Sequence, residues 1–139
     1  MDLCSRRVIS WAFSDKPNSE LTTRALRLAL QKRRVNHGLV FHSDQGCQYT
    51  SDAFQCSLKE FGIKSSMSRA GNCLGNAVTE HLFRSLKSER VNHRRYLTRQ
   101  QAKADIINYI EQFYNQKRRH YKLGNISPAQ YGQELRKSA

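Results

Sequence analysis

The chain has 139 residues, of which 24 are lysine or arginine and 11 are aspartate or glutamate, so its formal net charge is +13. This length favours one domain, and an aromatic content of 9% argues against a disordered chain. No apolar run approaches the roughly 20 residues of a membrane span, so we expect no membrane association, and the charge favours nucleic acid as partner ahead of acidic proteins.

The first half of the chain alternates strand-like and helix-like patterns. Alternating bulky residues predict a strand with one strongly buried face within residues 3–14, and a short apolar run predicts a buried strand at residues 39–42. The other predicted elements are a basic amphipathic helix at residues 19–34 with Ser19 as N-cap, a helix capped by Thr50 or Ser51 and stopped by Gly62, a strand at residues 63–67 and a loop at residues 68–75. This order of elements predicts an α/β sheet with parallel members.

The second half of the chain is predicted to be helical. Leu74, Val78, Leu82 and Leu86 recur every four residues and form the apolar stripe of a predicted helix at residues 74–90. A last long helix is predicted to begin after the cap residue Thr98 and to end near residues 117–120, with an apolar face made of Ala102, Ile106, Ile110 and Phe113. The pair Ser127 and Pro128 predicts the start of a final short helix.

Positive charge is concentrated between Arg84 and Lys122, where eleven lysines and arginines stand against three acidic residues. Four interleaved tyrosines offer stacking surfaces for bases or sugars. Because clustered like charges repel unless a polyanion screens them, phosphate contact is favoured over plain solvation for a group that we term the tail cluster: Lys117, Arg118, Arg119, His120 and Lys122. For the interior of the preceding helix, a solvated face with core tyrosines is an equal alternative.

Two carboxylates occupy positions of interest. Asp44 directly follows the predicted strand at residues 39–42, and Glu80 lies on the predicted helix at residues 74–90, on the side away from its apolar stripe. Thirty-five residues separate them. By position alone, an aspartate and a glutamate of this kind are typical of solvated surface groups, so the sequence around them decides whether they form a functional pair.

Three linked segments around these carboxylates resemble the integrase core of bacterial insertion-sequence transposases of the orfB type. They are His42–Ser51, Met67–Cys73 and Asn76–Glu89. The downstream segments Phe113–Asn115, Arg118–His120, Leu123–Gly124 and Ser127–Pro128 resemble the C-terminal signature of the same proteins, and Asp2, Leu3, Ser5, Arg6 and Trp11 match their second and third strands. The resemblance therefore extends over nearly the whole chain.

The resemblance implies a ribonuclease-H-like fold and a site in which two aspartates and one glutamate hold two divalent metals, Mg²⁺ or Mn²⁺. It assigns the second aspartate to Asp44 and the glutamate to Glu80, as catalytic residues and metal ligands. Hard oxygen ligands suit Mg²⁺, and two such ions activate the attacking oxygen and stabilise the departing one. Arg84 and Lys87, which follow Glu80 on the same helix face, are then placed to hold the DNA backbone, with surface solvation as an equal alternative.

The chain departs from this family pattern at two points. The first aspartate of the family lies on a first strand, upstream of the residues present here, and neither Asp2 nor Asp15 is a convincing substitute. We therefore expect an integrase core that lacks its first strand, leaves strand backbone groups without partners, binds Mg²⁺ weakly and is inactive alone. Gly75 stands where the family usually has aspartate, which removes a helix cap.

These expectations combine into one hypothesis. Residues 1–115 form a partial integrase catalytic core of the α/β class, and residues 116–139 form a basic C-terminal tail with a short helix. The chain resembles the C-terminal part of a transposase that cleaves and joins DNA strands by two-metal phosphodiester transfer. The alternatives are a non-catalytic DNA-binding remnant that modulates an intact transposase, and a basic RNA-associated factor.

The implied partners are DNA, as element ends and target, and an intact transposase or a second copy of the chain. The implied location is the bacterial cytoplasm, in association with the nucleoid.

Overall fold

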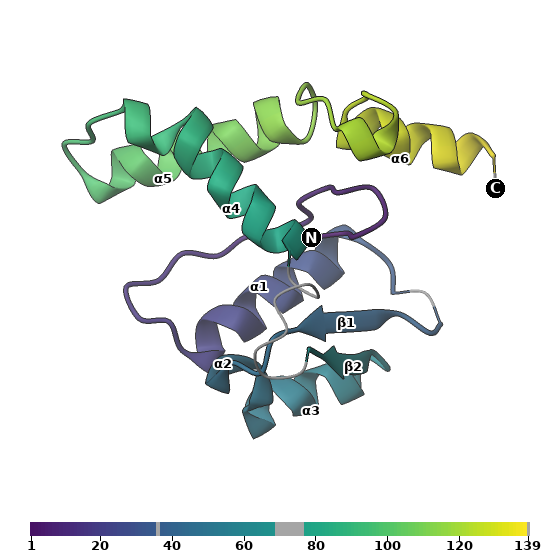
Figure 1. Ribbon diagram of the computed structural model, residues 1–139. Coiled ribbons are helices and arrows are strands. Elements are labelled where there is room, and N and C mark those ends of the chain that lie inside the picture. The colour runs from purple at the N-terminus through teal and green to yellow at the C-terminus, as the bar shows by residue number, and fades with distance from the viewer. Residues whose placement is uncertain (36, 69–76, 139) are drawn as a thin grey trace. The chain divides into compact units, whose positions relative to one another are not determined.

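The computed structural model describes residues 1–35, 37–68 and 77–138, which form two compact units (Figure 1). The sheet unit comprises residues 9–77, and the helical unit comprises residues 1–8 together with residues 78–139. The predicted loop at residues 68–75, with Gly75, and the stripe residue Leu74 lie almost entirely outside the described residues. Within the described ranges, no helix is both long and apolar enough to cross a membrane.

The sheet unit begins with helix α1, Ser19–Lys32. The predicted cap was wrong by one residue, because Asn18 and not Ser19 is the N-cap: the Asn18 side chain accepts a hydrogen bond from the Leu21 N–H at 3.1 Å. Glu20 lies in the first turn and Lys32 in the last, so both charges oppose the helix dipole at their ends.

A two-stranded parallel sheet follows in the described part of this unit. Strand β1, Val40–Ser43, pairs with strand β2, Lys64–Met67, with Val40 opposite Lys64 and Ser43 opposite Met67. The connection between them contains helix α2, Cys47–Thr50, and helix α3, Asp52–Glu60. Ser51 caps α3, and Gly62 adopts φ +65° just past its end, as the sequence predicted. The prediction of a sheet with parallel members is confirmed for these two strands, whose direct pairing is a finding of the structure.

The core of the sheet unit lies between α1, α3 and one face of the strands. Leu26 on α1, Phe54 and Leu58 on α3, and Ile63 are all buried and contact one another. Phe41 and Tyr49 pack edge-on against Phe54, with ring centroids 5.2 and 5.5 Å away from it. Val40, whose side chain points to the opposite face of β1 from Phe41, is 54% exposed. The prediction of a fully buried strand was therefore wrong at this residue, because helices cover one face of the pair.

The strand predicted within residues 3–14 is wrong: no residue of this segment belongs to a strand. A strand requires a neighbouring backbone that alternates donors and acceptors, and here other groups take those positions. The Ser10 hydroxyl donates to the Ala25 carbonyl at 2.8 Å, the Arg24 guanidinium donates to the Phe13 carbonyl, and the Asn115 side chain bonds the backbone of Val8. Arg6, at φ +60°, also interrupts an extended course. The observed order is thus αβααβ followed by helices.

The described part of the helical unit contains three α-helices, and the segments between them include 3₁₀ and π-helical turns. Helix α4 is Ala77–Glu89, the 3₁₀ turn η2 is Val91–His93, and helix α5 is Arg99–Asn108, capped by Thr98 as predicted. The 3₁₀ turn η4, Tyr121–Leu123, precedes helix α6, Pro128–Lys137, which has Ser127 as N-cap and proline at its first position. Leu82 and Leu86 of the predicted stripe are buried on α4.

A π-helical turn, η3, Tyr109–Tyr114, continues α5 and changes which side chains face inward. Its hydrogen bonds span five residues, as in the 3.0 Å bond from the Asn115 N–H to the Ile110 carbonyl. Tyr109, Ile110 and Tyr114 are buried, whereas Phe113 is 42% exposed. The prediction of Phe113 on the apolar face was therefore wrong, because the wider π-helical turn rotates its side chain outward, whereas Tyr114, four residues after Ile110, is buried.

Candidate functional site

Asp44 lies directly after the carboxyl end of β1 and is exposed. Its Oδ1 accepts a hydrogen bond from the Gly46 N–H at 3.0 Å, which fixes the carboxylate over the turn into α2. A Cβ added at Gly46 would come within 3.0 Å of Asp44 Oδ1 and 2.9 Å of Gln48 Oε1. Glycine therefore allows this close approach, and the turn presents the carboxylate to solvent at the edge of the sheet.

His42 secures the strand end that carries Asp44. Its Nδ1 lies 3.1 Å from the Ser66 hydroxyl and its Nε2 lies 3.0 Å from the Ser68 hydroxyl. Ser66 is the β2 partner of His42 in the parallel register, so the imidazole adds side-chain hydrogen bonds to the backbone ladder. The sequence motif contains His42, but the two serines that bond it are brought together only by the sheet.

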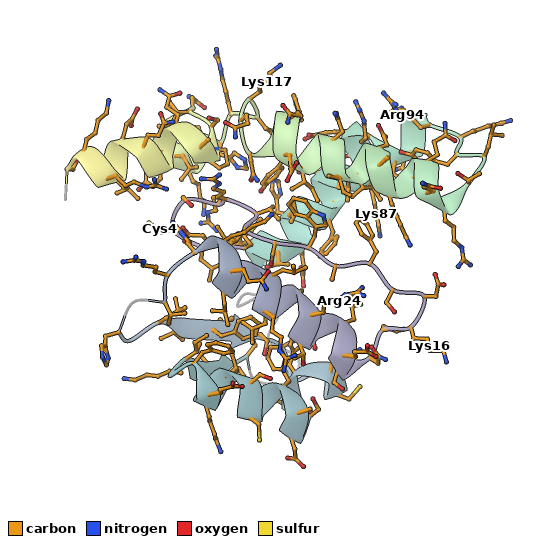
Figure 2. All side chains as sticks on the ribbon, turned by 180° about the vertical axis from the view of Figure 1, so that it is seen from behind. Cys4, Lys16, Arg24, Lys87, Arg94 and Lys117 are labelled. Atoms are coloured by element: carbon orange, nitrogen blue, oxygen red, sulfur yellow. The ribbon has the colours of Figure 1, made fainter. Side chains whose placement is uncertain are left out.

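Glu80 lies in the first turn of α4 and is exposed. Arg84 and Lys87 follow it on the same helix, four and seven residues later, and both are also exposed. Figure 2 labels Lys87 among the nitrogen-tipped side chains that project from the helical unit. Glu80, Arg84 and Lys87 are therefore accessible to a ligand, in keeping with the outward orientation that the helical spacing predicted.

The two candidate carboxylates belong to different units: Asp44 to the sheet unit and Glu80 to the helical unit. Among residues 1–35, 37–68 and 77–138, no three His, Cys, Asp or Glu side chains form a group that could hold a metal ion. The oxygen donors of Asp44 and Glu80 are of the type that Mg²⁺ prefers.

Arg118 of the tail cluster is engaged inside the helical unit. Its guanidinium donates to both carboxylate oxygens of Glu89, at 2.6 to 3.0 Å, and to the Ser85 hydroxyl at 3.1 Å. It also lies 5.7 Å from the centre of the Tyr114 ring. The hydrogen bond from Arg118 lowers the pKa of Glu89, against the opposing effect of burial, and the Tyr109 hydroxyl donates a further bond to Glu89 at 2.7 Å.

His120 of the tail cluster is 9% exposed and packs edge-on against Tyr114, with ring centroids 5.1 Å apart. Burial, together with the nearby charge of Arg118, lowers the pKa of His120 to about 4. The imidazole is therefore neutral at pH 7. The backbone of His120 pairs with Ile126, which closes the loop that leads into α6.

The other three members of the tail cluster are exposed: Lys117, Arg119 and Lys122. Tyr121, between them in sequence, is 87% exposed. The tail cluster thus divides into two inward members, Arg118 and His120, and three outward cations beside an exposed aromatic ring, of which Figure 2 labels Lys117. The sequence presented all five as one basic run, because a run of charges carries no information about which members face inward.

A charged cluster around Asp105 was not predicted from the sequence. Asp105 on α5 is 11% exposed and accepts hydrogen bonds from Arg90 at 2.8 to 3.1 Å, from Arg94 at 3.1 Å and from the Tyr96 hydroxyl at 2.8 Å. Burial alone would raise the pKa of Asp105, but the hydrogen bonds from Arg90 and Tyr96 hold it below its ordinary value. The sequence contained no signal for this cluster, since Asp105 stands alone on a helix whose surroundings are basic.

Two family models match the chain, and both describe an integrase core domain. The first covers residues 1–73 and the second covers residues 80–135. The two matches together leave out only residues 74–79 and the last four residues.

Curated proteins similar to this chain come from bacterial insertion sequences. A 31 kDa protein of the insertion element IS600 from Shigella sonnei is 40% identical over 99% of this chain and 51% of its own length. The transposase of IS904 from Lactococcus lactis is 38% identical over 94% of this chain and 52% of its own length, and the transposase InsF of IS3A from Escherichia coli is 39% identical over 94% and 46%. The chain thus spans about half the length of the curated relatives it matches.

Solved structures similar to this chain are retroviral integrases. The catalytic core domain of the BIV integrase superimposes with a TM-score of 0.66 and 19% sequence identity, over 96% of this chain and 82% of that one. A chain of the simian T-cell lymphotropic virus intasome superimposes with the same TM-score over 85% of this chain. At these identities the likeness concerns the fold, which is therefore that of a ribonuclease-H-like integrase core.

Proposed function

The chain belongs to the integrase core domain family, and from that premise we propose that it takes part in DNA transposition as a portion of a transposase catalytic core. The observation that carries this proposal is the 38 to 40% identity with insertion-sequence proteins over 94 to 99% of the chain. The exposure of Asp44 and Glu80 supports it, because carboxylates that hold a metal at a DNA strand must be accessible to both.

In this proposal, Asp44 and Glu80 are two of the ligands for Mg²⁺ or Mn²⁺. A bound divalent metal supplies Lewis-acid stabilisation of a phosphodiester displacement. His42 and Gly46 act as positioning residues, since they hold the strand end and the turn that carry Asp44. Two carboxylates hold a divalent ion less tightly than the three that the resemblance implies, so we expect weak metal binding and no strand cleavage or joining by the chain alone.

The exposed cations supply the DNA contacts in the same proposal. Arg84 and Lys87 contact the backbone near Glu80, and Lys117, Arg119 and Lys122 contact it from the tail cluster. Arg118 and His120, which bind internal partners, support DNA binding by holding the tail cluster in place. In the same proposal, residues 1–115 form the catalytic portion and residues 116–139 form the basic tail. The chain acts in the bacterial cytoplasm, in association with the nucleoid.

A second candidate function is that of a non-catalytic DNA-binding protein that modulates an intact transposase. The specific observation in its favour is that Arg84, Lys87 and the three outward cations of the tail cluster are exposed. Such a chain would compete for element ends or join the multimer of an intact relative. The two candidates share DNA binding and differ in whether Glu80 has a catalytic role.

The test is a cleavage and joining assay with duplex DNA that carries element ends of an insertion sequence similar to IS600 or IS3. The purified chain is incubated with Mg²⁺ or Mn²⁺, alone and mixed with an intact transposase of that element. Glu80→Gln is compared with Glu111→Gln, which removes an exposed glutamate elsewhere in the helical unit.

We expect duplex binding that weakens steeply with salt, no nicking by the chain alone, and reduced activity of the mixture. Nicking by the chain alone that Glu80→Gln abolishes and Glu111→Gln preserves would contradict the expected inactivity of the isolated chain and rule out the non-catalytic candidate. Absence of any duplex binding would contradict both candidates.

A further inference from the structure

The helical unit contains a cavity of about 580 Å³ at the end of α4 and along α5. Its charged lining consists of Arg90, Arg94, Arg95 and Asp105, so three positive charges face one negative charge. Tyr96 and Asn108 also line it. None of these residues belongs to the segments that resemble transposase motifs or to the tail cluster, so the cavity is a separate surface from both.

Asp105 organises this lining and leaves part of it available. Arg90 uses both Nε and Nη2 on the carboxylate, whereas Arg94 uses only Nη1 and its side chain stays 49% exposed. Arg95 is exposed and forms no ion pair with any residue of the described ranges. Because Asp105 accepts from Arg90, Arg94 and Tyr96, it orients Arg90 and Arg94, and its one negative charge does not cancel the three positive charges of the lining.

We propose that this cavity is a binding site for a phosphodiester of a DNA backbone, with Arg94 and Arg95 as its donors. The inference rests on the proposed function and extends it, since it names a contact surface that the motifs do not include. A guanidinium presents a planar fork of N–H donors that matches two oxygens of one phosphate. An arginine held by a buried carboxylate loses little further side-chain entropy when it binds.

The chemistry of the lining favours a nucleic acid over an acidic peptide. Apart from Ala104 and the ring of Tyr96, the lining is polar or charged. Protein interfaces gain much of their stability from apolar and aromatic anchors in a desolvated centre, which this lining does not provide. A phosphate backbone needs only cations and hydrogen-bond donors at a regular spacing.

The first experiment measures affinity for a fluorescent DNA duplex of arbitrary sequence, about 20 base pairs long, at several salt concentrations. Arg94→Ala with Arg95→Ala is compared with Arg136→Ala, which removes an exposed arginine of α6 that does not line the cavity. Arg95→Ala alone is included because it leaves every hydrogen bond of Asp105 intact.

We expect the double variant to bind about fivefold more weakly or worse, with the salt slope reduced by roughly one for each lost phosphate contact. Arg95→Ala should lie between the wild type and the double variant, and Arg136→Ala should bind within about twofold of the wild type. Equal affinity of the double variant and Arg136→Ala would overturn the inference and leave the proposed function intact.

A second measurement separates this inference from the proposed function. Arginine Nε–Hε resonances are followed by NMR while dimethyl phosphate, a minimal phosphodiester, is added to the wild-type chain. The signals of Arg94 and Arg95 should shift, and that of Arg136 should not. Failure of the wild-type chain to bind duplex DNA would refute the proposed function. Unchanged Arg94 and Arg95 signals on addition of dimethyl phosphate would overturn the cavity site, whether or not the chain binds duplex DNA. If a polyglutamate peptide displaced dimethyl phosphate from the cavity and duplex DNA did not, the cavity would be assigned to an acidic protein, and the inference would be overturned.

Discussion

The side-chain amide of Asn115 forms two hydrogen bonds with the backbone of Val8, which lies 107 residues earlier in the chain. The Val8 N–H donates to Asn115 Oδ1 at 2.9 Å, and Asn115 Nδ2 donates to the Val8 carbonyl at 3.0 Å. Both residues are buried. The amide thus supplies one donor and one acceptor to a single residue, as a neighbouring strand would, and it joins the N-terminal segment to the end of η3.

We expect Asn115→Ala to lower the free energy of unfolding by about 2–4 kcal/mol, because it leaves a buried N–H and a buried carbonyl without partners. Asn115→Asp should cost at least as much, since a carboxylate accepts from Val8 but donates nothing and carries a buried charge. Urea denaturation measures the loss, and hydrogen exchange of the Val8 amide should accelerate. The control is Asn92→Asp at an exposed position. Unchanged protection of the Val8 amide in Asn115→Ala would contradict this role.

The adjacent arginines Arg118 and Arg119 should respond differently to truncation. Arg118→Ala breaks a partly buried pair with Glu89, so we expect a loss of stability of about 1–3 kcal/mol, between the values for exposed and buried pairs. Arg119→Ala, at an exposed site, should change stability by less than about 0.5 kcal/mol and should weaken binding to duplex DNA. Thermal denaturation and a DNA titration on both variants check this. A stable Arg118→Ala would show that the pair with Glu89 does not form.

His120 should make the helical unit sensitive to mild acid. The folded chain keeps the imidazole neutral down to about pH 4, whereas the unfolded chain protonates it near its ordinary pKa of 6.5. The unfolded state therefore binds one more proton between these values, and the free energy of unfolding should fall by about 1–2 kcal/mol as the pH falls from about 6.5 to about 4, after allowance for solvent screening.

His120→Gln tests this dependence, because glutamine stays neutral throughout the window. Urea denaturation of the two proteins at pH 7, 6, 5 and 4.5 should give a steeper decline for the wild type. Glu89, whose pKa is lowered, contributes a separate decline at more acidic pH, where its carboxylate becomes protonated, and this decline should be common to both proteins. Parallel curves across the whole range would rule out a buried neutral His120.

The π-helical turn predicts opposite effects at two neighbouring aromatic residues. Tyr114→Ala removes a ring that is 1% exposed, so we expect a loss of about 3–5 kcal/mol or failure to fold. Phe113→Ala removes a ring that is 42% exposed, although it packs 5.5 Å from Tyr109, and should cost no more than about 1.5 kcal/mol. Circular dichroism during urea denaturation measures both. A larger loss for Phe113→Ala than for Tyr114→Ala would contradict the burial of Tyr114 and the exposure of Phe113.

Local features of the sequence were enough to predict where most helices begin and end. The caps Ser51, Thr98 and Ser127 and the stop at Gly62 were predictable because each acts within three or four residues of its own position. The roles of Asp44 and Glu80 stay predictions. Their exposure agrees with those roles, but a metal centre depends on how the two units meet and on a third carboxylate, and neither follows from the residues around each one.

By itself, the sequence determined the family, a sheet with parallel members and a strongly positive net charge, because motifs, short apolar runs and composition are properties of neighbouring residues or of the whole chain. The tertiary structure alone decided that the segment around Val8 is bonded by a side chain and not by a strand, that Arg118 and His120 face inward, and that Arg90, Arg94 and Asp105 line one cavity. The hydrogen-bond partners are 107 residues apart for Val8 and Asn115, 29 for Arg118 and Glu89, and 11 to 15 for the two arginines and Asp105. The free energy of such contacts comes from burial and charge pairing between distant segments, which no local pattern specifies.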